Sequence, residues 1–298
     1  MIDNDVGIIL LVYNEEIHLK RCLDNLLLLT SNIYVVDSYS NDNTLDILNE
    51  YGIHYVQNKF LNQSHQLNFA IKNYPFNTNW ILRVDCDELL TLELINEIKK
   101  SNLLNIKSNI SGFYIKRKVK FFNKILNFGN INPIWLLRLW KRGKGVCDDK
   151  WMDEKIIISD QKTAKLQNLI IDNNLNNLTW WINKHNDYSN REALEILKNK
   201  HLANNNSFVS DYYSIDFFIF ILKSIYNKSP IFLRSFLLFI YSYFFKLGIL
   251  DGLPGFIWNV LQVFWYRYLV DVKVYEFEYS HGFDQEKIKA ELIKINAK

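Results

Sequence analysis

The first 85 residues alternate short apolar runs with stretches of helical length, and this alternation constrains the fold more than any other feature of the chain. Runs of strand length cover residues 6–12, 33–37, 54–57 and 80–84. Helical stretches lie between them and cover residues 15–29, 44–50 and 63–74. A β-α-β alternation with such short links predicts an α/β fold, in which a parallel sheet carries helices on both faces.

Two aspartates follow the fourth apolar run, in the stretch WILRVDCDELL. Asp85 and Asp87 can turn towards one ion, because the strand relaxes into a loop at this point. Carboxylate oxygens suit Mg²⁺ or Mn²⁺, and ligands of open α/β sheets lie outside the carboxyl ends of the strands. The spacing predicts a divalent-metal site, and the alternative is a solvated acidic turn before a helix at Thr91.

Polar side chains also follow the first two strands, at Tyr13, Asn14, Glu15, Asp37 and Ser38. The carboxyl ends of parallel strands share one edge, so a nucleotide could lie across them, with Asp37 accepting a hydrogen bond from the base or ribose. Ordinary loop polarity gives the same pattern, since N-caps and Asx-turns also place Asp and Asn after strands. We prefer this alternative for Asn14, as an N-cap, and for Ser38.

Several classes of protein are excluded by motif and composition. The first strand is followed by neither G-x-G-x-x-G nor a Walker A motif, which argues against dinucleotide oxidoreductases and P-loop NTPases. The net charge of +3 on 298 residues is too small to indicate nucleic-acid binding by itself. Three isolated cysteines fit neither a zinc site nor a disulfide framework. The N-terminus lacks the basic region of a signal peptide, so we expect a cytoplasmic protein.

Several stretches together resemble glycosyltransferase family 2, and they cover most of the chain. Three of these stretches lie at the ends of the first, second and fourth strands: VYNEE, VVDSYSNDNTLDI and RVDCDELL. PIWLLRLWKRGKGVCDDKWMDEK, KHNDYSNREA and ILDGLPGF resemble the bacterial branch that builds lipopolysaccharide core and exopolysaccharide. The resemblance implies a GT-A fold, a nucleotide-sugar donor, a divalent metal and inversion at the anomeric carbon.

The resemblance also implies roles for individual residues. Inverting transfer needs a carboxylate that takes the proton from the attacking hydroxyl; Glu154 falls on this position and Asp153 is the second choice, although Glu154 could instead pair with Lys155. His185 is a candidate third metal ligand beside Asp85 and Asp87, although a lone histidine is more often structural. We expect the donor to be bound by Tyr13, Asn14, Glu15, Asp37, Ser38, Asn68, Asp85 and Arg138. Trp135 and Trp140 either contact the acceptor or lie in the core.

Aromatic residues crowd the last third of the chain, from residue 212 to residue 268. A membrane-spanning helix needs about 20 apolar residues, and the apolar runs here are shorter or interrupted. Trp, Tyr, Lys and Arg at this density suit the membrane–water interface, where Arg234, Lys246 and Arg267 would attract anionic lipid. The alternative is a helical bundle that packs on the catalytic domain.

We therefore expect a GT-A catalytic domain at residues 1–206, with a donor-binding half before about residue 100, and a membrane-associating helical region at residues 207–298. The expected protein is an inverting, metal-dependent glycosyltransferase that uses Mn²⁺ or Mg²⁺ and binds no nucleic acid. It would act on a lipid-linked saccharide at the inner face of the cell membrane. The alternatives are a nucleotidyltransferase, which would need a basic, Gly-rich loop after the first strand, and a non-catalytic scaffold at the membrane that binds nucleotide sugar.

Overall fold

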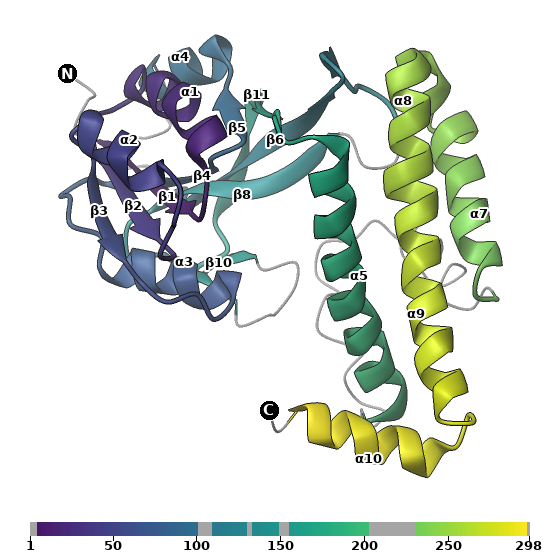
Figure 1. Cartoon of the computed structure of the whole chain (residues 1–298). Helices are drawn as coiled ribbons and strands as arrows, with labels where there is room; N and C mark the ends of the chain where they lie inside the picture. Colours follow the sequence, from purple (N-terminus) through teal and green to yellow (C-terminus); the bar gives the residue numbers. More distant parts are fainter. Residues whose placement is uncertain (1–4, 101–108, 130–132, 149–154, 203–229, 297–298) are drawn as a thin grey trace. The chain divides into compact units, whose positions relative to one another are not determined.

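The computed structural model describes residues 5–100, 109–129, 133–148, 155–202 and 230–296 (Figure 1). The chain forms two compact units. The sheet unit comprises Met1–Asn127 and Ile131–Asn176, and the helical unit comprises Phe128–Asn130 and Asn177–Lys298. The domain boundary expected near residue 206 lies outside the described residues and stays a prediction.

The sheet unit is built on one mixed sheet with the strand order β3-β2-β1-β4-β8-β6-β11-β5. Four neighbouring strands run parallel: β1 (Val6–Val12), β2 (Ile33–Asp37), β3 (His54–Gln57) and β4 (Trp80–Asp85). The sheet continues with β8 (Ile134–Lys141), β6 (Gly112–Phe121), β11 (Thr163–Asp172) and β5 (Glu88–Leu90). Here β8 is antiparallel to β4 and β6, β11 is parallel to β6, and β5 is antiparallel to β11. Shorter pairings involve β7 (Lys124–Ile125) with β6, and β9 (Gly145–Cys147) with β10 (Ile156–Ile158).

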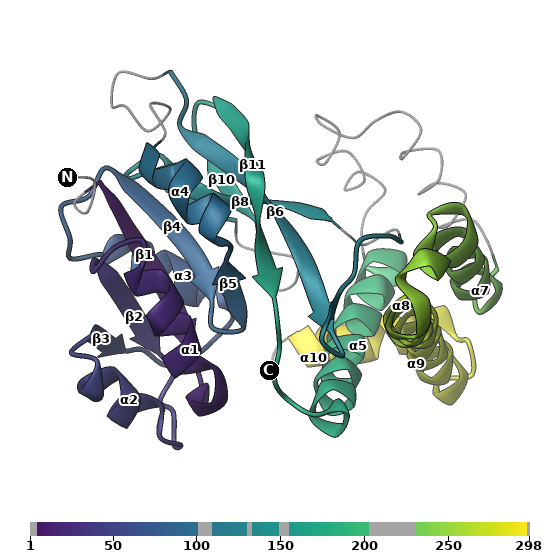
Figure 2. The same cartoon turned by 90° about the horizontal axis from the view of Figure 1, so that it is seen from above.

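Helices cover both faces of the parallel part of the sheet (Figure 2). The residues of α1 (Glu16–Leu27), α2 (Thr44–Glu50) and α4 (Leu92–Lys100) share one core cluster with alternate strand residues such as Ile8. The residues of α3 (Gln63–Lys72) share a second cluster with the intervening strand residues, such as Ile9. Burial on both faces explains why β1 is apolar along its whole length.

The structure confirms the expected α/β, GT-A-like fold class, and the first three strands begin and end at the predicted residues. Trp140 lies in the core at 0% exposure. The predicted N-cap at Asn14 is wrong, because Asn14 has a φ of 53° and Glu15 occupies the N-cap position of α1. The short strands β5 and β9 and the long strand β11 were not predicted.

The helical unit contains α5 (Leu178–His201), α7 (Leu233–Ile240), α8 (Gly252–Trp258), α9 (Tyr266–Ser280) and α10 (Gln285–Asn296). Three short helical segments complete it: η3 (Tyr241–Phe245), η4 (Gly248–Asp251) and η5 (Asn259–Trp265). Its core joins α5, α9 and α10 through apolar side chains such as Leu197, Val270 and Leu292. The aromatic-rich C-terminal helices expected from the sequence are therefore present.

No single helix in the part of the chain that the structure describes is long and apolar enough to cross a membrane. The helical stretches Leu233–Phe245 and Gly248–Ser280 meet this length and composition test only as a pair, with a bend of 70° between them.

Candidate active site

The carboxyl ends of the parallel strands meet at one edge of the sheet, as the sequence predicted. Val12 at the end of β1 pairs in register with Asp37 at the end of β2, and Leu11 pairs with Asp85 at the end of β4. The next strand continues this edge, because Asp37 pairs with Gln57. The residues that follow these strands therefore lie along the same edge of the sheet.

Asp85 is held by two arginines. Arg138 comes from β8, and its Nη2 lies 2.8 Å from Asp85 Oδ2. Arg83 Nε lies 3.4 Å from Asp85 Oδ1. Burial alone would raise the pKa of Asp85, but Arg138 and Arg83 outweigh it and hold the pKa far below its usual value. Asp85 is thus a fixed carboxylate, and 30% of its side chain remains exposed.

Glu88 lies beneath this pair and is fully buried. Its Oε1 accepts a hydrogen bond of 2.8 Å from Arg138 Nη2, and its Oε2 accepts one of 3.0 Å from the backbone N–H of Asp85. Burial raises the pKa of Glu88, and the neighbouring arginine only partly opposes this effect. The Glu88 carboxylate therefore holds both the backbone of Asp85 and the side chain of Arg138 in place.

Asp172, at the end of β11, belongs to the same cluster. Arg117 Nη1 lies 3.6 Å from Asp172 Oδ2 and 3.5 Å from Glu88 Oε1. Burial and the nearby charge of Asp87 raise the pKa of Asp172 to about 7, against the pull of Arg117. Sequence reasoning missed this residue, although an apolar run that ends in Asp, Leu-Ile-Ile-Asp, is the signal that found Asp37 and Asp85.

Asp87 is tied to the segment that follows β11. Its Oδ2 accepts a hydrogen bond of 3.0 Å from Asn174 Nδ2, and its backbone oxygen accepts one of 2.8 Å from the N–H of Asn173. The Arg21 guanidinium of α1 donates to the backbone oxygen of Asn173 at 2.8 Å. These bonds hold the Asp87 carboxylate in place while leaving its side chain partly exposed.

Glu15 is connected to the same segment through a buried histidine. His18 is 1% exposed and its Nδ1 lies 2.6 Å from Glu15 Oε2. The backbone N–H of Leu175 donates to His18 Nε2 at 2.9 Å. Because Nε2 accepts this bond, the ring is neutral and its proton is on Nδ1. The Nδ1–H group therefore donates a hydrogen bond to Glu15. Sequence reasoning missed His18, since it lies inside an ordinary amphipathic helix.

Asp37 is placed at the strand end as predicted, but it is fully buried. Its carboxylate accepts bonds from the backbone N–H groups of Tyr39 and Ser40 at 3.0 and 3.1 Å, from Ser40 Oγ at 2.5 Å and from Gln57 Nε2 at 2.9 Å. Asp37 thus shapes the loop after β2. Its expected contact with a base or ribose stays a prediction.

The remaining donor-site candidates of the sheet unit lie in loops and on α3. Tyr13 is 56% exposed beside the strand ends. Asn14 Oδ1 accepts from the backbone N–H of Asn41 at 2.9 Å, and Ser38 Oγ accepts from Gln66 Nε2 at 3.0 Å. The Asn68 side chain donates to and accepts from the backbone of Cys147, both at 2.9 Å. Asn14, Ser38 and Asn68 each use a side-chain polar group to hold neighbouring structure.

Asp153 and Glu154 lie outside the described residues, so their catalytic roles stay predictions. His185 belongs to α5 of the helical unit, where its ring stacks on Trp181 with 3.6 Å between ring centroids. Its Nδ1 lies 2.9 Å from the backbone oxygen of Trp181, and burial lowers the pKa of the ring. The role of His185 as a metal ligand stays a prediction.

The two carboxylates at the end of β4 fit a hard divalent cation that is also bound by a ligand. Among the described residues, no group of three or more His, Cys, Asp and Glu side chains is arranged to hold a metal ion. Asp85 and Asp87 nevertheless offer two carboxylates that are both partly exposed. Mg²⁺ and related ions are commonly bound by one or two carboxylates together with substrate phosphates and water. The donor set therefore fits an ion that arrives with a phosphorylated ligand.

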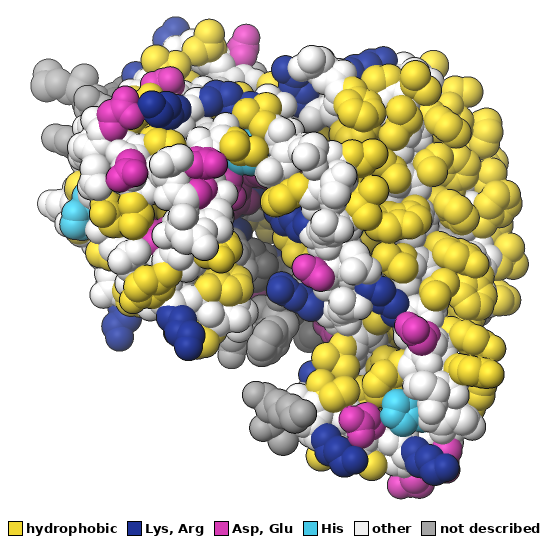
Figure 3. All heavy atoms as spheres, in the orientation of Figure 1, with side chains coloured by type: hydrophobic (Ala, Val, Ile, Leu, Met, Phe, Trp, Pro, Cys, Tyr) yellow, Lys and Arg dark blue, Asp and Glu magenta, His cyan; other side chains and the backbone are white. Residues whose placement is uncertain are grey.

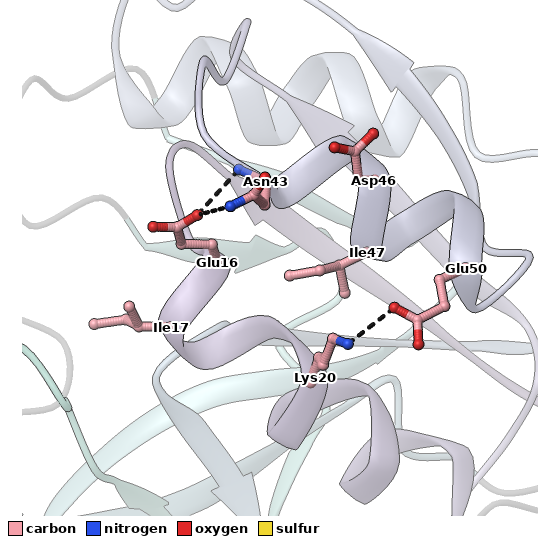
Figure 4. A pocket seen from close by; sticks show the side chains of 7 residues that line it. All are labelled: Glu16, Ile17, Lys20, Asn43, Asp46, Ile47 and Glu50. Carbon is pink, nitrogen blue, oxygen red and sulfur yellow. Dashed lines mark hydrogen bonds and ion pairs between the residues drawn. The ribbon is translucent and has the colours of Figure 1, made fainter.

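A shallow pocket of about 560 Å³ lies between α1 and α2 (Figure 4). Lys20 and Glu50, which line it, form an ion pair, and Asn43 donates two hydrogen bonds to Glu16. The lining residues are Glu16, Ile17, Lys20, Asn43, Asp46, Ile47 and Glu50. None of the predicted site residues lines this pocket, so it is separate from the strand-end cluster.

Comparisons with known proteins find one family model that matches the first part of the chain. Residues 7–124 match the model of Glycosyl transferase family 2. An uncharacterized glycosyltransferase of Rickettsia typhi is 30% identical over 94 residues, which are 32% of this chain and 32% of that protein. The chain thus matches about a third of the length of this curated relative.

Two solved structures show similarity at low identity. Residues 1–349 of S. aureus TarS in complex with UDP are 12% identical, with 93% of this chain and 92% of that chain covered and a TM-score of 0.42. Glucosyl-3-phosphoglycerate synthase from Mycobacterium tuberculosis, with Mn²⁺ and UDP-glucose, is 17% identical, with 39% and 44% covered and a TM-score of 0.31. Residues 7–124, which supply Asp85, Asp87 and Glu88 to the cluster, match a glycosyl transferase family 2 domain, and this match supports a glycosyltransferase.

Proposed function

We propose that this chain is an inverting, metal-dependent glycosyltransferase that moves a sugar from a nucleotide-sugar donor to a lipid-linked saccharide, such as a lipopolysaccharide core or an exopolysaccharide. The observation that carries the proposal is the pair of partly exposed carboxylates, Asp85 and Asp87, at the carboxyl end of β4 inside the matched segment. Buried arginines fix the first carboxylate and Asn174 fixes the second. A site of this kind suits a nucleotide diphosphate that is bound together with a metal ion.

The residues of the sheet unit would divide the work between binding and positioning. Asp85 and Asp87 would hold the metal ion, which when bound would neutralise charge on the departing nucleotide diphosphate. Arg138 and Glu88 keep Asp85 charged and oriented before the donor arrives, so little reorganisation is needed. Glu154 is the proposed base that takes the proton from the acceptor hydroxyl as it attacks the anomeric carbon.

The surface of the helical unit supports a lipid-linked acceptor. Exposed hydrophobic side chains gather over α7, α8 and α9 (Figure 3). Phe245 is 74% exposed, Leu253 is 69% exposed and Leu250 is 58% exposed. Contiguous exposed apolar surface of this extent marks interaction sites, and an aromatic-rich helix pair without a clean span suits the lipid headgroup layer. We therefore propose that this unit binds the cytoplasmic face of the cell membrane, where a lipid-linked saccharide is accessible.

The structure changes one part of the expected lipid electrostatics. Arg234 is ion-paired with Asp271, and Arg267 is ion-paired with Glu192. Because both arginines already have carboxylate partners, their attraction for anionic lipid is smaller than the sequence suggested. In this proposal the apolar side chains supply most of the affinity for the membrane.

Nucleotide binding measured by calorimetry tests the donor part of the proposal. UDP and GDP are titrated into the full chain with Mn²⁺ and then with EDTA, and we expect tighter binding with Mn²⁺. Asp87→Asn should weaken binding and abolish its dependence on Mn²⁺, whereas Asp46→Asn, at an exposed position on α2, should change neither. Equal affinity with EDTA would refute the metal, and hydrolysis of a sugar nucleotide with Mn²⁺ separates an enzyme from a non-catalytic scaffold.

A further inference from the structure

Phe128 and Gly129 belong to the helical unit, although the residues before and after Phe128–Asn130 belong to the sheet unit. The backbone N–H of Phe128 donates to Asp251 Oδ2 at 2.9 Å. The backbone N–H of Gly129 donates to the backbone oxygen of Lys246, also at 2.9 Å. These bonds attach the connection between β7 and β8 to the turn that joins η3 to α8.

Three buried polar side chains lie in and around this turn: Ser242 in η3, Asp251 in η4 and Asn259 in η5. Ser242 is 0% exposed, Asp251 is 2% exposed and Asn259 is 3% exposed. Ser242 Oγ donates to Asn259 Oδ1 at 2.6 Å, and Asn259 Nδ2 donates to the backbone oxygen of Gly255 at 2.8 Å. Buried polar groups are costly unless they are hydrogen-bonded, so their presence indicates a specific structural task. We call Ser242, Asp251 and Asn259, together with the backbone of Phe128 and Gly129, the clasp.

Glycines allow the backbones of the clasp to approach closely. Gly129 has a φ of 87°, and a Cβ there would lie 3.3 Å from Ser242 Oγ. A Cβ on Gly255 would lie 2.4 Å from Asp251 Cβ, and one on Gly248 would lie 2.9 Å from Asn259 Nδ2. The stretch ILDGLPGF, which the family resemblance singled out without a role, therefore builds a turn that only glycine permits and places Asp251 in it.

The clasp is close in sequence both to the surface proposed for lipid binding and to the strand that carries Arg138. Exposed Phe245 and Leu253 lie on either side of Asp251 in sequence. Five residues after Gly129 the chain enters β8 at Ile134, and β8 supplies Arg138 to Asp85 and Glu88.

We propose that Asp251 is a positioning residue that fastens the β7–β8 connection to the lipid-binding turn, so that binding of a lipid surface further orders Phe128 and Gly129. The lipid part rests on the membrane association proposed above, whereas the clasp itself does not. A ligand that stabilises the folded turn raises the free energy of opening every bond that depends on it. The amides of Phe128 and Gly129 therefore report on lipid binding only while Asp251 is present.

Amide hydrogen exchange of the full chain tests the clasp without any substrate. Asp251→Ala should speed exchange at Phe128 and Gly129 at least tenfold, while the amides of the α5–α9–α10 core keep their rates. Asp251→Asn retains an acceptor oxygen and should stay within about threefold of the wild type, and Asp187→Ala, at an exposed position on α5, should have no effect. Gly129→Ala leaves Asp251 intact but strains the other side of the clasp, and it should also speed exchange at Phe128.

Vesicles of phosphatidylcholine with phosphatidylglycerol test the coupling to lipid. In the wild type, vesicle binding should slow exchange at Phe128 and Gly129 by several fold. Asp251→Ala should still bind the vesicles but should show no such slowing. The role of Asp251 in the clasp would be refuted if Asp251→Ala kept wild-type exchange rates at both amides. It would also be refuted if exchange became equally faster throughout the helical core. A wild type that does not bind vesicles would overturn the membrane proposal and the coupling, while the lipid-free rates would still decide the clasp.

Discussion

Replacement of Arg138 by methionine should destabilise the sheet unit strongly, because it removes the nearer of the two arginines that neutralise a fully buried carboxylate, Glu88. Arg138 is 5% exposed, and its Nη2 lies 2.8 Å from both Asp85 Oδ2 and Glu88 Oε1. Removal of one partner from a buried ion pair costs about 3–5 kcal/mol. Glu88 bears most of this cost, since it is fully buried and keeps only Arg117, at 3.5 Å, whereas Asp85 is partly exposed and keeps Arg83 at 3.4 Å.

Urea unfolding followed by circular dichroism at pH 7, in EDTA, measures this cost. The double variant Arg138→Met with Glu88→Gln removes the stranded charge, so it should recover at least half of the lost stability. The deficit of the single variant should also shrink towards pH 5, because a Glu88 without its arginine becomes protonated more easily. A loss below about 1 kcal/mol for Arg138→Met, or a double variant no more stable than the single one, would refute the argument that Arg138 compensates Glu88.

Three further predictions concern proton transfer, pH and lipid. Glu154→Gln should bind nucleotide normally and turn over about 10²- to 10⁴-fold more slowly; near-normal turnover would move the role to Asp153. In EDTA, the free energy of unfolding should fall as pH rises from about 4 to about 7, because the pKa of Asp172 is raised to about 7 in the folded state. Asp172→Asn should reduce this fall, and an unchanged profile would contradict the assignment to Asp172. Phe245→Ser combined with Leu253→Ser should weaken vesicle sedimentation about 10²-fold, as expected for two large apolar side chains, while Leu92→Ser in the sheet unit should not; unchanged sedimentation would contradict the lipid surface.

The parallel part of the fold could be predicted because its strands are buried on both faces and read as continuous apolar runs. The strand β11 could not, because its sequence TAKLQNLIID mixes Lys, Gln and Asn with apolar residues and only part of it is buried. The strands β5 and β9 have three residues each, which is too short for any periodic pattern. The order of the strands could not be predicted from local sequence patterns either. No sequence motif indicates that β8 and β6 lie between β4 and β11 in the sheet.

The candidate site, too, could be predicted only where local sequence patterns determine the position of a residue. The sequence places Asp37 and Asp85 correctly, because an apolar strand that ends in Asp is a local pattern. It does not predict that Asp37 would be fully buried by its own loop, or that Glu88 would turn inwards and accept from the Asp85 backbone. These outcomes depend on how neighbouring loops and arginines from distant strands fill the space around each carboxylate.

The contact from His18 to Leu175 shows why such long-range information matters for function. The two residues are 157 positions apart. The end of β11 pairs with β5 at Asp172 and Glu88, and β5 is bonded to Asn25 of α1, so this pairing brings the segment after β11 back to α1. That segment also holds Asp87 through Asn173 and Asn174. One piece of chain therefore sets the orientation of Glu15, through the neutral His18 ring, and of Asp87, through two bonds. Strand order, rather than any local motif, thus places one segment of chain against the acids that follow both the first and the fourth strand.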